Sequence, residues 1–398
     1  MRKFLLLTYL LMTTTLVEGA IDIIFDYTYD TGNYFGDEQR YIMEQVAYVF
    51  ESRMGGETFA SSIPTDYLTA PNTVSATFNF DNPTTGVATS VNVGSTTSEG
   101  NVVGKAGELL IFLGARSLSG STLASAGETG YGYSASGDIS AWKNAFDARD
   151  STTNFDPRAG SSQVNTSQTF YFDTDLTTHA DALSSGKTDF YSVMVHEIGH
   201  VIGFNTHNAW NANVSGGYWT GDNAKEQYNE QNIPLYSTPH WDLPTDGTPG
   251  NTGNLNPAYV GCSCHPSMLP SIGIDTRTSF SDLDFALLKD IGYSISASPV
   301  GTNIGGTFTD PDWGGTYDIP VSMSYNDWIA AGGGNGSAGG GGGAGGGGGA
   351  GGGGGGGGGL SAAPEPAYIF TMLGGFIASL SGRKKLKTLF FAIKARFA

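Results

Sequence analysis

The ten residues Val195–Phe204 read V-H-E-I-G-H-V-I-G-F and contain the pattern H-E-x-x-H. His196 and His200 are four residues apart, so in a helix their imidazoles lie on one face, one turn apart. That spacing allows both rings to bind one zinc ion from a rigid support. Glu197 would then lie beside the ion, where its carboxylate can take a proton from a zinc-bound water and pass it to a leaving amine.

Flanking residues favour the helix that this pattern needs. Thr188 or Asp189 can cap its start, and Gly203 lets the chain turn away at its end. Apolar contacts come from the positions around the motif, which are Val193, Val195, Ile198, Val201 and Ile202. An exposed helix whose polar side chains meet only water is the simpler alternative, but a solvated face would not alternate so closely with apolar residues.

Regular structure is predicted mainly upstream of this helix. β-branched and aromatic residues favour strands, and an apolar period of 3.6 residues favours a helix. On these grounds we expect strands at residues 21–27, 74–80, 108–113 and 168–172, and a helix at residues 37–54. The strand at 108–113 shows no polar alternation, so it is expected to be buried on both faces. The predicted fold class is α+β.

Downstream of the motif helix the sequence predicts little regular structure. Residues 205–265 are rich in Asn, Gly, Pro and Trp, with a short helix expected near Asn223–Tyr228 and a last helix at Ser281–Ile291. Catalytic zinc needs a third protein ligand and one open position. Two histidines are candidates: His240, which lies between a proline and a tryptophan, and His207, which lies in a polar loop where a lone histidine is usually solvated.

The N-terminus and a glycine-rich segment differ in composition from the body. Residues 1–20 begin with two basic residues, continue with an apolar run and end in small residues. This is the layout of a secretory signal peptide, and cleavage is expected after Gly19. The apolar run is too short to favour a membrane anchor. Residues 331–359 are predicted to be a flexible linker, because they hold 23 of the chain's 60 glycines.

Residues 360–398 contain Pro364-Glu365-Pro366, an apolar stretch at 367–380 and a basic cluster that begins at Arg383. An apolar segment with a basic cap is held in a membrane with its basic side inward. These parts resemble the PEP-CTERM sorting signal of Gram-negative bacteria. The resemblance implies transient anchoring in the inner membrane, processing by an exosortase-type enzyme, and export to the cell surface, the extracellular matrix or the medium. An ordinary C-terminal anchor is the alternative.

The charge of the body excludes one class of partner. Residues 1–20 and 367–398 hold eight of the 19 basic and one of the 37 acidic residues, which leaves 11 basic and 36 acidic residues and a net charge of −25. A body this acidic will not bind nucleic acid through a basic groove. The sequence has two cysteines, Cys262 and Cys264, so no disulfide framework holds the fold. A local disulfide between them, or no role, is expected rather than a metal site.

The order of motifs in the body resembles that of metzincin-type zinc metallopeptidases, most closely leishmanolysin-like enzymes and their exported bacterial relatives. In that group H-E-x-x-H-x-x-G-F is followed by an insertion, a His-Trp pair, a methionine turn and a helix of the type S-x-x-D-x-A-x-L-x-D-I-G-[WY]. The matching parts here are His196–Phe204, His240-Trp241, Ser267–Pro270 with Met268, and Ser281–Tyr293, over about 100 residues.

The resemblance implies a zinc-dependent endopeptidase with one catalytic Zn²⁺ and Glu197 as general base. The peptidase domain would span residues 21–300, with a C-terminal extension at 301–330. A mixed β-sheet with two long helices would form its N-terminal half, and a mostly irregular C-terminal half would place Met268 beneath the ion. The edge strand of the sheet would hold a protein or peptide substrate by strand addition. That strand is expected to be the one containing Leu110, Phe112 and Gly114.

The resemblance also implies that the third ligand is His240 rather than His207. The common metzincin spacing puts a histidine ten residues after the first one, where this chain has Thr206. His240 instead precedes Met268 by 28 residues, in the order of the leishmanolysin-like enzymes. The long excursion before it costs little, because loop-closure entropy grows slowly with length. The expected metal ligands are His196, His200 and His240.

Two other functions are compatible with parts of this pattern. A non-catalytic surface or matrix protein could keep the same scaffold, although such a protein has no need of Glu197. A zinc hydrolase of another fold could use Glu226 or Glu230 as the third ligand. The placement of Met268 and of the last helix favours the metzincin-like interpretation over that second alternative.

Overall fold

The computed structural model describes most of the body of the chain. The described residues are 21–54, 71–178, 185–236, 239–243, 266–275, 277–299, 303–305, 307–309 and 316–333. The expected signal peptide, the PEP-CTERM-like segment, nearly all of the glycine-rich linker and both cysteines lie outside them. Within the described part, helices and strands combine as an α+β fold, which confirms the predicted class. No helix of that part is both long and apolar enough to cross a membrane.

The main sheet has four strands in the order β1-β4-β7-β5. Their bounds are Asp22–Asp26 for β1, Glu108–Arg116 for β4, Gly160–Asn165 for β7 and Ala124–Glu128 for β5. β1, β4 and β7 run parallel, whereas β5 is antiparallel to β7 and forms one border of the sheet. The sheet is therefore mixed, and its one antiparallel strand is an outer strand.

β4 is not the edge strand that the sequence led us to expect. It pairs with β1 on one side and with β7 on the other, so it is an inner strand of the sheet. The side chains of Leu110 and Phe112 lie in a small core on one face of the sheet. A Cβ atom on Gly114 would lie 2.6 Å from the hydroxyl of Thr84, so a loop covers that position. These three residues cannot line a substrate groove.

The prediction that this strand is buried on both faces is confirmed. Leu109, Ile111 and Leu113 point into the main core, and the alternate residues point into the small core. A second sheet closes the small core; its strands, in spatial order, are β3 (Ala88–Asn92), β2 (Thr73–Asp81) and β6 (Gly130–Ser136). Stacking of Phe80 on Phe112, with ring centroids 4.7 Å apart, joins the two sheets.

Two long helices, α1 (Asp37–Glu51) and α3 (Phe190–Ile202), pack on the other face of the main sheet. α3 is the motif helix, and it begins as predicted, because the Asp189 carboxylate accepts a hydrogen bond from the Ser192 backbone N–H at 3.1 Å. All of its residues are buried. A Cβ atom on Gly160 of β7 would lie 2.5 Å from the Val201 side chain, so this glycine permits close approach of α3 to the sheet.

Several elements between β4 and α3 were not predicted. β5 and β6 consist mainly of Ala, Ser and Gly with two tyrosines, and so lack the β-branched residues that favour strands. The helix α2 (Ser140–Asp147) packs on β6 through aromatic contacts, with Trp142 beside Tyr133. The expected strand at 168–172 is only β8 (Phe170–Tyr171), which pairs with β9 (Thr188–Asp189) just before α3.

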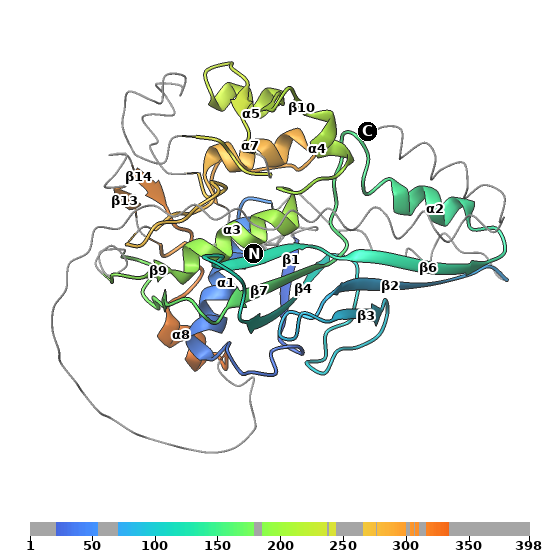
Figure 1. Cartoon of the computed structure of the whole chain (residues 1–398), viewed down its shortest axis with the longest axis horizontal. Coiled ribbons are helices and arrows are strands. Elements are labelled where there is room, and N and C mark those ends of the chain that lie inside the picture. Colours follow the sequence, from blue (N-terminus) through green and yellow to red (C-terminus); the bar gives the residue numbers. More distant parts are fainter. Residues whose placement is uncertain are drawn as a thin grey trace, which may run out of the picture.

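Short elements make up the described part of the chain after α3. They are α4 (Asn208–Ala212), β10 (Val214–Ser215), β11 (Tyr218–Trp219), α5 (Asp222–Gln227), β12 (Ile233–Pro234) and α7 (Asp282–Asp290). α5 and α7 are the two helices predicted for this region. Figure 1 shows α4, α5 and α7 on one side of α3 and the main sheet on the other. α3 thus lies between a regular half and a largely irregular half.

The described part of the expected C-terminal extension packs against the body. It contains β13 (Thr307–Thr309), β14 (Thr316–Asp318) and α8 (Tyr325–Ala330). Ile319 and Val321 are fully buried in the main core. The Gln45 side chain of α1 accepts a hydrogen bond from the Ser322 N–H at 2.8 Å, and Tyr41 of the same helix donates to the Met323 carbonyl at 2.9 Å. Residues 319–330 therefore belong to the folded body.

Two truncations test this boundary. Removing residues from Ala331 onward should leave a folded, soluble body. Removing residues from Gly301 onward should destabilise it by roughly 3–6 kcal/mol, because each fully buried Ile or Val side chain contributes about 1.5–3 kcal/mol. Urea unfolding followed by tryptophan fluorescence measures both. Equal unfolding midpoints for the two proteins would show that the C-terminal segment adds nothing to the core.

Candidate metal centre

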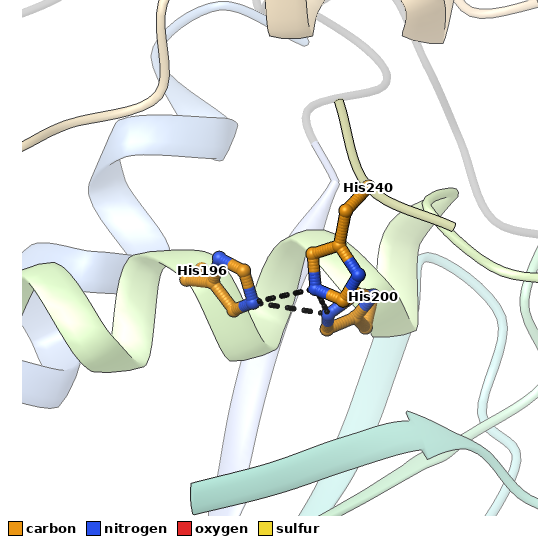
Figure 2. Close-up of side chains that lie close together, drawn as sticks. All are labelled: His196, His200 and His240. Carbon is orange, nitrogen blue, oxygen red and sulfur yellow. Dashed lines mark hydrogen bonds between the residues drawn. The ribbon is translucent and has the colours of Figure 1, made fainter. Parts of the chain in front are cut away.

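Three histidine side chains meet in the space between α3 and the irregular half. His196 and His200 come from successive turns of α3, and His240 comes from the segment 239–243 on the other side (Figure 2). The three Nε2 atoms form a triangle in which each pair is 3.1 Å apart. All three residues are buried. They form the one group of His, Cys, Asp or Glu side chains, among the described residues, that could hold a metal ion.

Backbone carbonyls fix the orientation of two of the rings. His196 Nδ1 donates to the Ser267 carbonyl at 2.7 Å, and His200 Nδ1 donates to the Phe204 carbonyl at 2.6 Å. Because a carbonyl can only accept, both Nδ1 atoms carry a proton. In the neutral rings, the Nε2 atoms therefore present lone pairs toward the centre of the triangle. A hydrogen bond on the other ring nitrogen is the usual support of a metal-bound histidine.

The donor set fits a divalent cation. Burial lowers the pKa of His200 to about 4, and burial together with the two neighbouring imidazoles lowers the pKa of His240, so these rings are neutral at neutral pH. His196 and His200, whose Nδ1 atoms carry the protons, cannot hydrogen-bond to each other through Nε2 when neutral, and their two lone pairs repel. A cation in the centre turns that repulsion into attraction. The Nε2 atoms are 3.1 Å apart, which is close to the distance of about 3.3 Å expected between two nitrogens bound to one tetrahedral zinc ion.

Hydrogen bonds between two distant segments hold His240 in place. The Trp241 N–H donates to the Met268 carbonyl at 2.9 Å, and the Tyr236 N–H donates to the His240 carbonyl at 3.0 Å. Trp241 also forms an isolated antiparallel bridge with Leu235. The third imidazole is therefore positioned by backbone pairing rather than by a helix.

Met268 lies against α3 between the first two histidines. A Cβ atom on Gly199 would be 2.5 Å from Met268 Sδ and 2.8 Å from the Phe280 ring. Gly199 is thus the position at which the methionine side chain touches the motif helix. The preceding residue, Ser267, supplies the carbonyl that holds His196. One short turn therefore both orients a histidine and fills the space below the motif.

Gly203 is needed for packing rather than for backbone flexibility. α3 ends at Gly203 as predicted, but the φ of −178° at this glycine is extended and open to any residue, so the backbone conformation does not require glycine. A Cβ atom there would lie 2.5 Å from the Ile291 side chain and 2.8 Å from that of Leu288. The close approach of α7 to the end of α3 therefore requires glycine. The Tyr293 hydroxyl strengthens the same contact by donating to the Ile202 carbonyl at 2.9 Å.

Glu197 lies on the helix that carries His196 and His200. It follows His196 directly on α3 and is 2 % exposed. A carboxylate kept from bulk water on the helix that carries His196 and His200 can exchange a proton with a reactant that reaches it. The chemistry that this arrangement can support is proton transfer beside a metal-bound reactant.

His207 lies outside the triangle. We expected a solvated side chain, but His207 is buried. Its ring stacks on Phe155 with centroids 3.8 Å apart. Nδ1 accepts a hydrogen bond from the Trp210 N–H, which caps α4, and Nε2 donates to the Gly203 carbonyl at 3.1 Å. Burial lowers the pKa of His207 to about 4, so the ring is neutral at neutral pH. Its role is structural: it joins α4 to the end of α3.

The other proposed ligands do not reach the centre. Glu226 and Glu230 are exposed and do not belong to the histidine group. The carbonyls of Ser267 and Phe204 could not be identified from the sequence, since every residue carries a carbonyl and only the fold decides which one meets a histidine. Comparisons of the chain with protein-family models, with curated proteins and with solved structures found no match.

Single substitutions separate the two candidate third ligands. His240→Ala should lower zinc content from about one ion per chain to nearly none, because two imidazoles bind far more weakly than three. His207→Ala should keep the metal but lower the unfolding temperature, since it removes a cap and a stacked ring. Atomic absorption after dialysis and thermal unfolding measure the two effects. Loss of zinc in His207→Ala with retention in His240→Ala would reverse the assignment.

Proposed function

We propose that the protein is an exported zinc-dependent endopeptidase. The observation that carries this proposal is the triangle of three imidazoles, whose Nε2 atoms are 3.1 Å apart, with Glu197 on the same helix as two of them. Three histidines leave one position of a tetrahedral ion open, which is the arrangement of catalytic rather than structural zinc sites. Three imidazole ligands with a carboxylate on the same helix suit hydrolysis of a peptide bond.

In this proposal each group at the site has its own role in hydrolysis. A zinc ion held by His196, His200 and His240 would polarise the scissile carbonyl and lower the pKa of the attacking water. Glu197 takes the proton from that water and later donates it to the leaving amine. The carbonyls of Ser267 and Phe204 keep two of the imidazoles in the required tautomer and orientation.

β5 is the strand that we propose holds the substrate. Thr129 N–H donates to the Ala159 carbonyl and Asn165 N–H donates to the Leu123 carbonyl, so odd-numbered residues face β7. N–H and C=O groups alternate along a strand, and residues 124, 126 and 128 therefore present theirs to the outer side. An extended peptide can pair there by strand addition. β5 also packs beside α3, which carries two of the histidines.

The opposite border of the sheet is less suited to this role. There, the outward N–H of Ile23 in β1 already donates to the Glu51 carboxylate at 2.8 Å, and the Tyr27 N–H donates to Glu99 at 3.0 Å. Side-chain carboxylates thus occupy positions that a peptide would need. The contrast supports β5 as the receiving strand.

The same features support a metzincin-like interpretation of the fold. The mixed sheet has two long helices on one face, and the chain after α3 is mostly irregular, with Met268 against the motif helix and α7 closing the domain. In this proposal the N-terminal signal directs export, and an exosortase-type enzyme processes the C-terminal segment after transient contact with the inner membrane. The mature protein acts on proteins or peptides outside that membrane of a Gram-negative bacterium, and its acidic body does not bind nucleic acid.

Replacing the general base tests the chemistry. Glu197→Gln should retain zinc and the fold but lose most peptide hydrolysis, because general acid–base assistance contributes about 10²–10⁴-fold. Cleavage of a casein-like substrate, with zinc content measured on the same sample, gives the result. Turnover near that of the unmodified protein would exclude this mechanism, and an unmodified protein that binds zinc but cleaves nothing would favour a non-catalytic role.

Proline in β5 tests the proposed substrate strand. Ala126→Pro removes an N–H that makes no bond to β7, so the sheet should survive while strand addition by the substrate is blocked. We expect KM to rise about tenfold or more, since one main-chain hydrogen bond is lost and the proline ring obstructs pairing. Ala126→Ser keeps the N–H and serves as control. Unchanged KM in a folded, zinc-loaded Ala126→Pro protein would move the substrate elsewhere.

A further inference from the structure

The carboxylate of Asp284 on α7 is fully buried and accepts four hydrogen bonds. The Trp241 indole N–H donates to Oδ1 at 2.8 Å, and the Ser267 N–H donates to Oδ2 at 2.9 Å. The Ser281 N–H and hydroxyl both donate to Oδ2 at 2.8 Å. An ionised carboxylate offers about four acceptor sites and no donor, so it is matched to these four partners.

Two of these donors belong to the segments that build the metal centre. Ser267 supplies the carbonyl that receives His196 Nδ1. Trp241 follows His240 in the chain, and its own N–H pairs with the Met268 carbonyl. A single buried side chain therefore joins the segment that orients the first histidine to the segment that carries the third.

We propose that Asp284 is a positioning residue that sets the distance between His240 and the histidines of α3 and thereby determines metal affinity. The proposal rests on the proposed zinc site. α3 fixes the spacing of His196 and His200 by itself, since they are one helical turn apart. His240 lies 40 residues beyond His200 in the sequence, and backbone pairing with Tyr236 and of Trp241 with Met268 holds its segment. The Asp284 carboxylate adds a buried side-chain link from α7 to that segment and to Ser267.

A neutral side chain could not make this link. Burial raises the pKa of Asp284 to about 6, against the hydrogen bonds that lower it, so the group is ionised at neutral pH. An amide in its place would turn an NH₂ group toward one set of donors, either the indole or the Ser267 and Ser281 groups. One segment would then lose its partner and be left with an unsatisfied buried N–H.

Asp290, at the end of α7, is a matched control. Its carboxylate also accepts four hydrogen bonds, from the Trp219 indole, from the N–H and side chain of Asn223 and from the Ala224 N–H, at 2.8–3.1 Å. These partners anchor α5 and β11 and include no residue that carries or orients a histidine. Asp290→Asn should therefore weaken the irregular half without altering the metal site.

The experiment compares Asp284→Asn, Asp290→Asn and the unmodified full chain, purified in detergent. Zinc affinity is measured by competition with a chelator, and the ligand field is measured by visible absorption after loading with Co²⁺, at a temperature where all three are folded. We expect Asp284→Asn to bind zinc about 10–100-fold more weakly, with a shifted Co²⁺ spectrum. Asp290→Asn should keep both properties although its unfolding temperature falls.

Equal zinc affinity and equal spectra in Asp284→Asn and the unmodified chain would overturn the inference, as would equal losses in both variants, which would indicate general destabilisation. If the unmodified chain binds no zinc or Co²⁺, it is the proposed function that fails. Should Asp284→Asn not fold, Trp241→Phe removes only one of the four donors and keeps the carboxylate. It should lower zinc affinity several-fold, and an unchanged affinity would contradict the positioning role.

Discussion

The convergence of three imidazole nitrogens in a buried space is the constraint on which the rest of this structure depends. The Nε2 lone pairs of His196 and His200 face each other at 3.1 Å and repel, so the surrounding protein must hold these rings together until a cation binds. α3 supplies two of the rings, and packing against the main sheet makes that helix rigid. The third ring comes from a segment without regular structure. The fold must therefore hold the segment 239–243, which carries His240, against α3.

The two halves of the body are stabilised in different ways. The half before α3 relies on apolar burial, in which β4 contributes side chains to a core on each of its faces. The half after α3 has short elements, and buried polar groups hold them in place. Asp284 and Asp290 of α7 each accept an indole N–H and several backbone N–H groups. The buried carboxylate of Asp284 is tolerated because its acceptor sites are satisfied, and both carboxylates give an irregular segment a defined position.

Glycines show how closely α3 is enclosed. Gly160 lies below it, Gly199 faces Met268, and Gly203 faces α7, and at each position a Cβ atom would lie 2.5 Å from a neighbouring side chain. The helix is therefore fixed from the sheet side and from the irregular side at once. A metal centre built on this helix has little freedom to change its geometry, which favours a site preformed for one coordination number.

The sequence alone determined the features that depend on local geometry. The spacing of His196 and His200, the cap of α3, the helices α1, α5 and α7 and the burial of β4 on both faces all follow from short-range periods and capping residues. Strand order could not be obtained this way, because the pairing partners of β4 lie far apart in the chain and its apolar run is equally compatible with an edge or a centre. β5 was missed because Ala, Ser and Gly carry no strand signal, and it forms only because β7 offers it a partner. The environment of His207, the carbonyls that orient His196 and His200, and the link through Asp284 were likewise decided by the tertiary structure, since each joins groups that only long-range packing brings within hydrogen-bond distance.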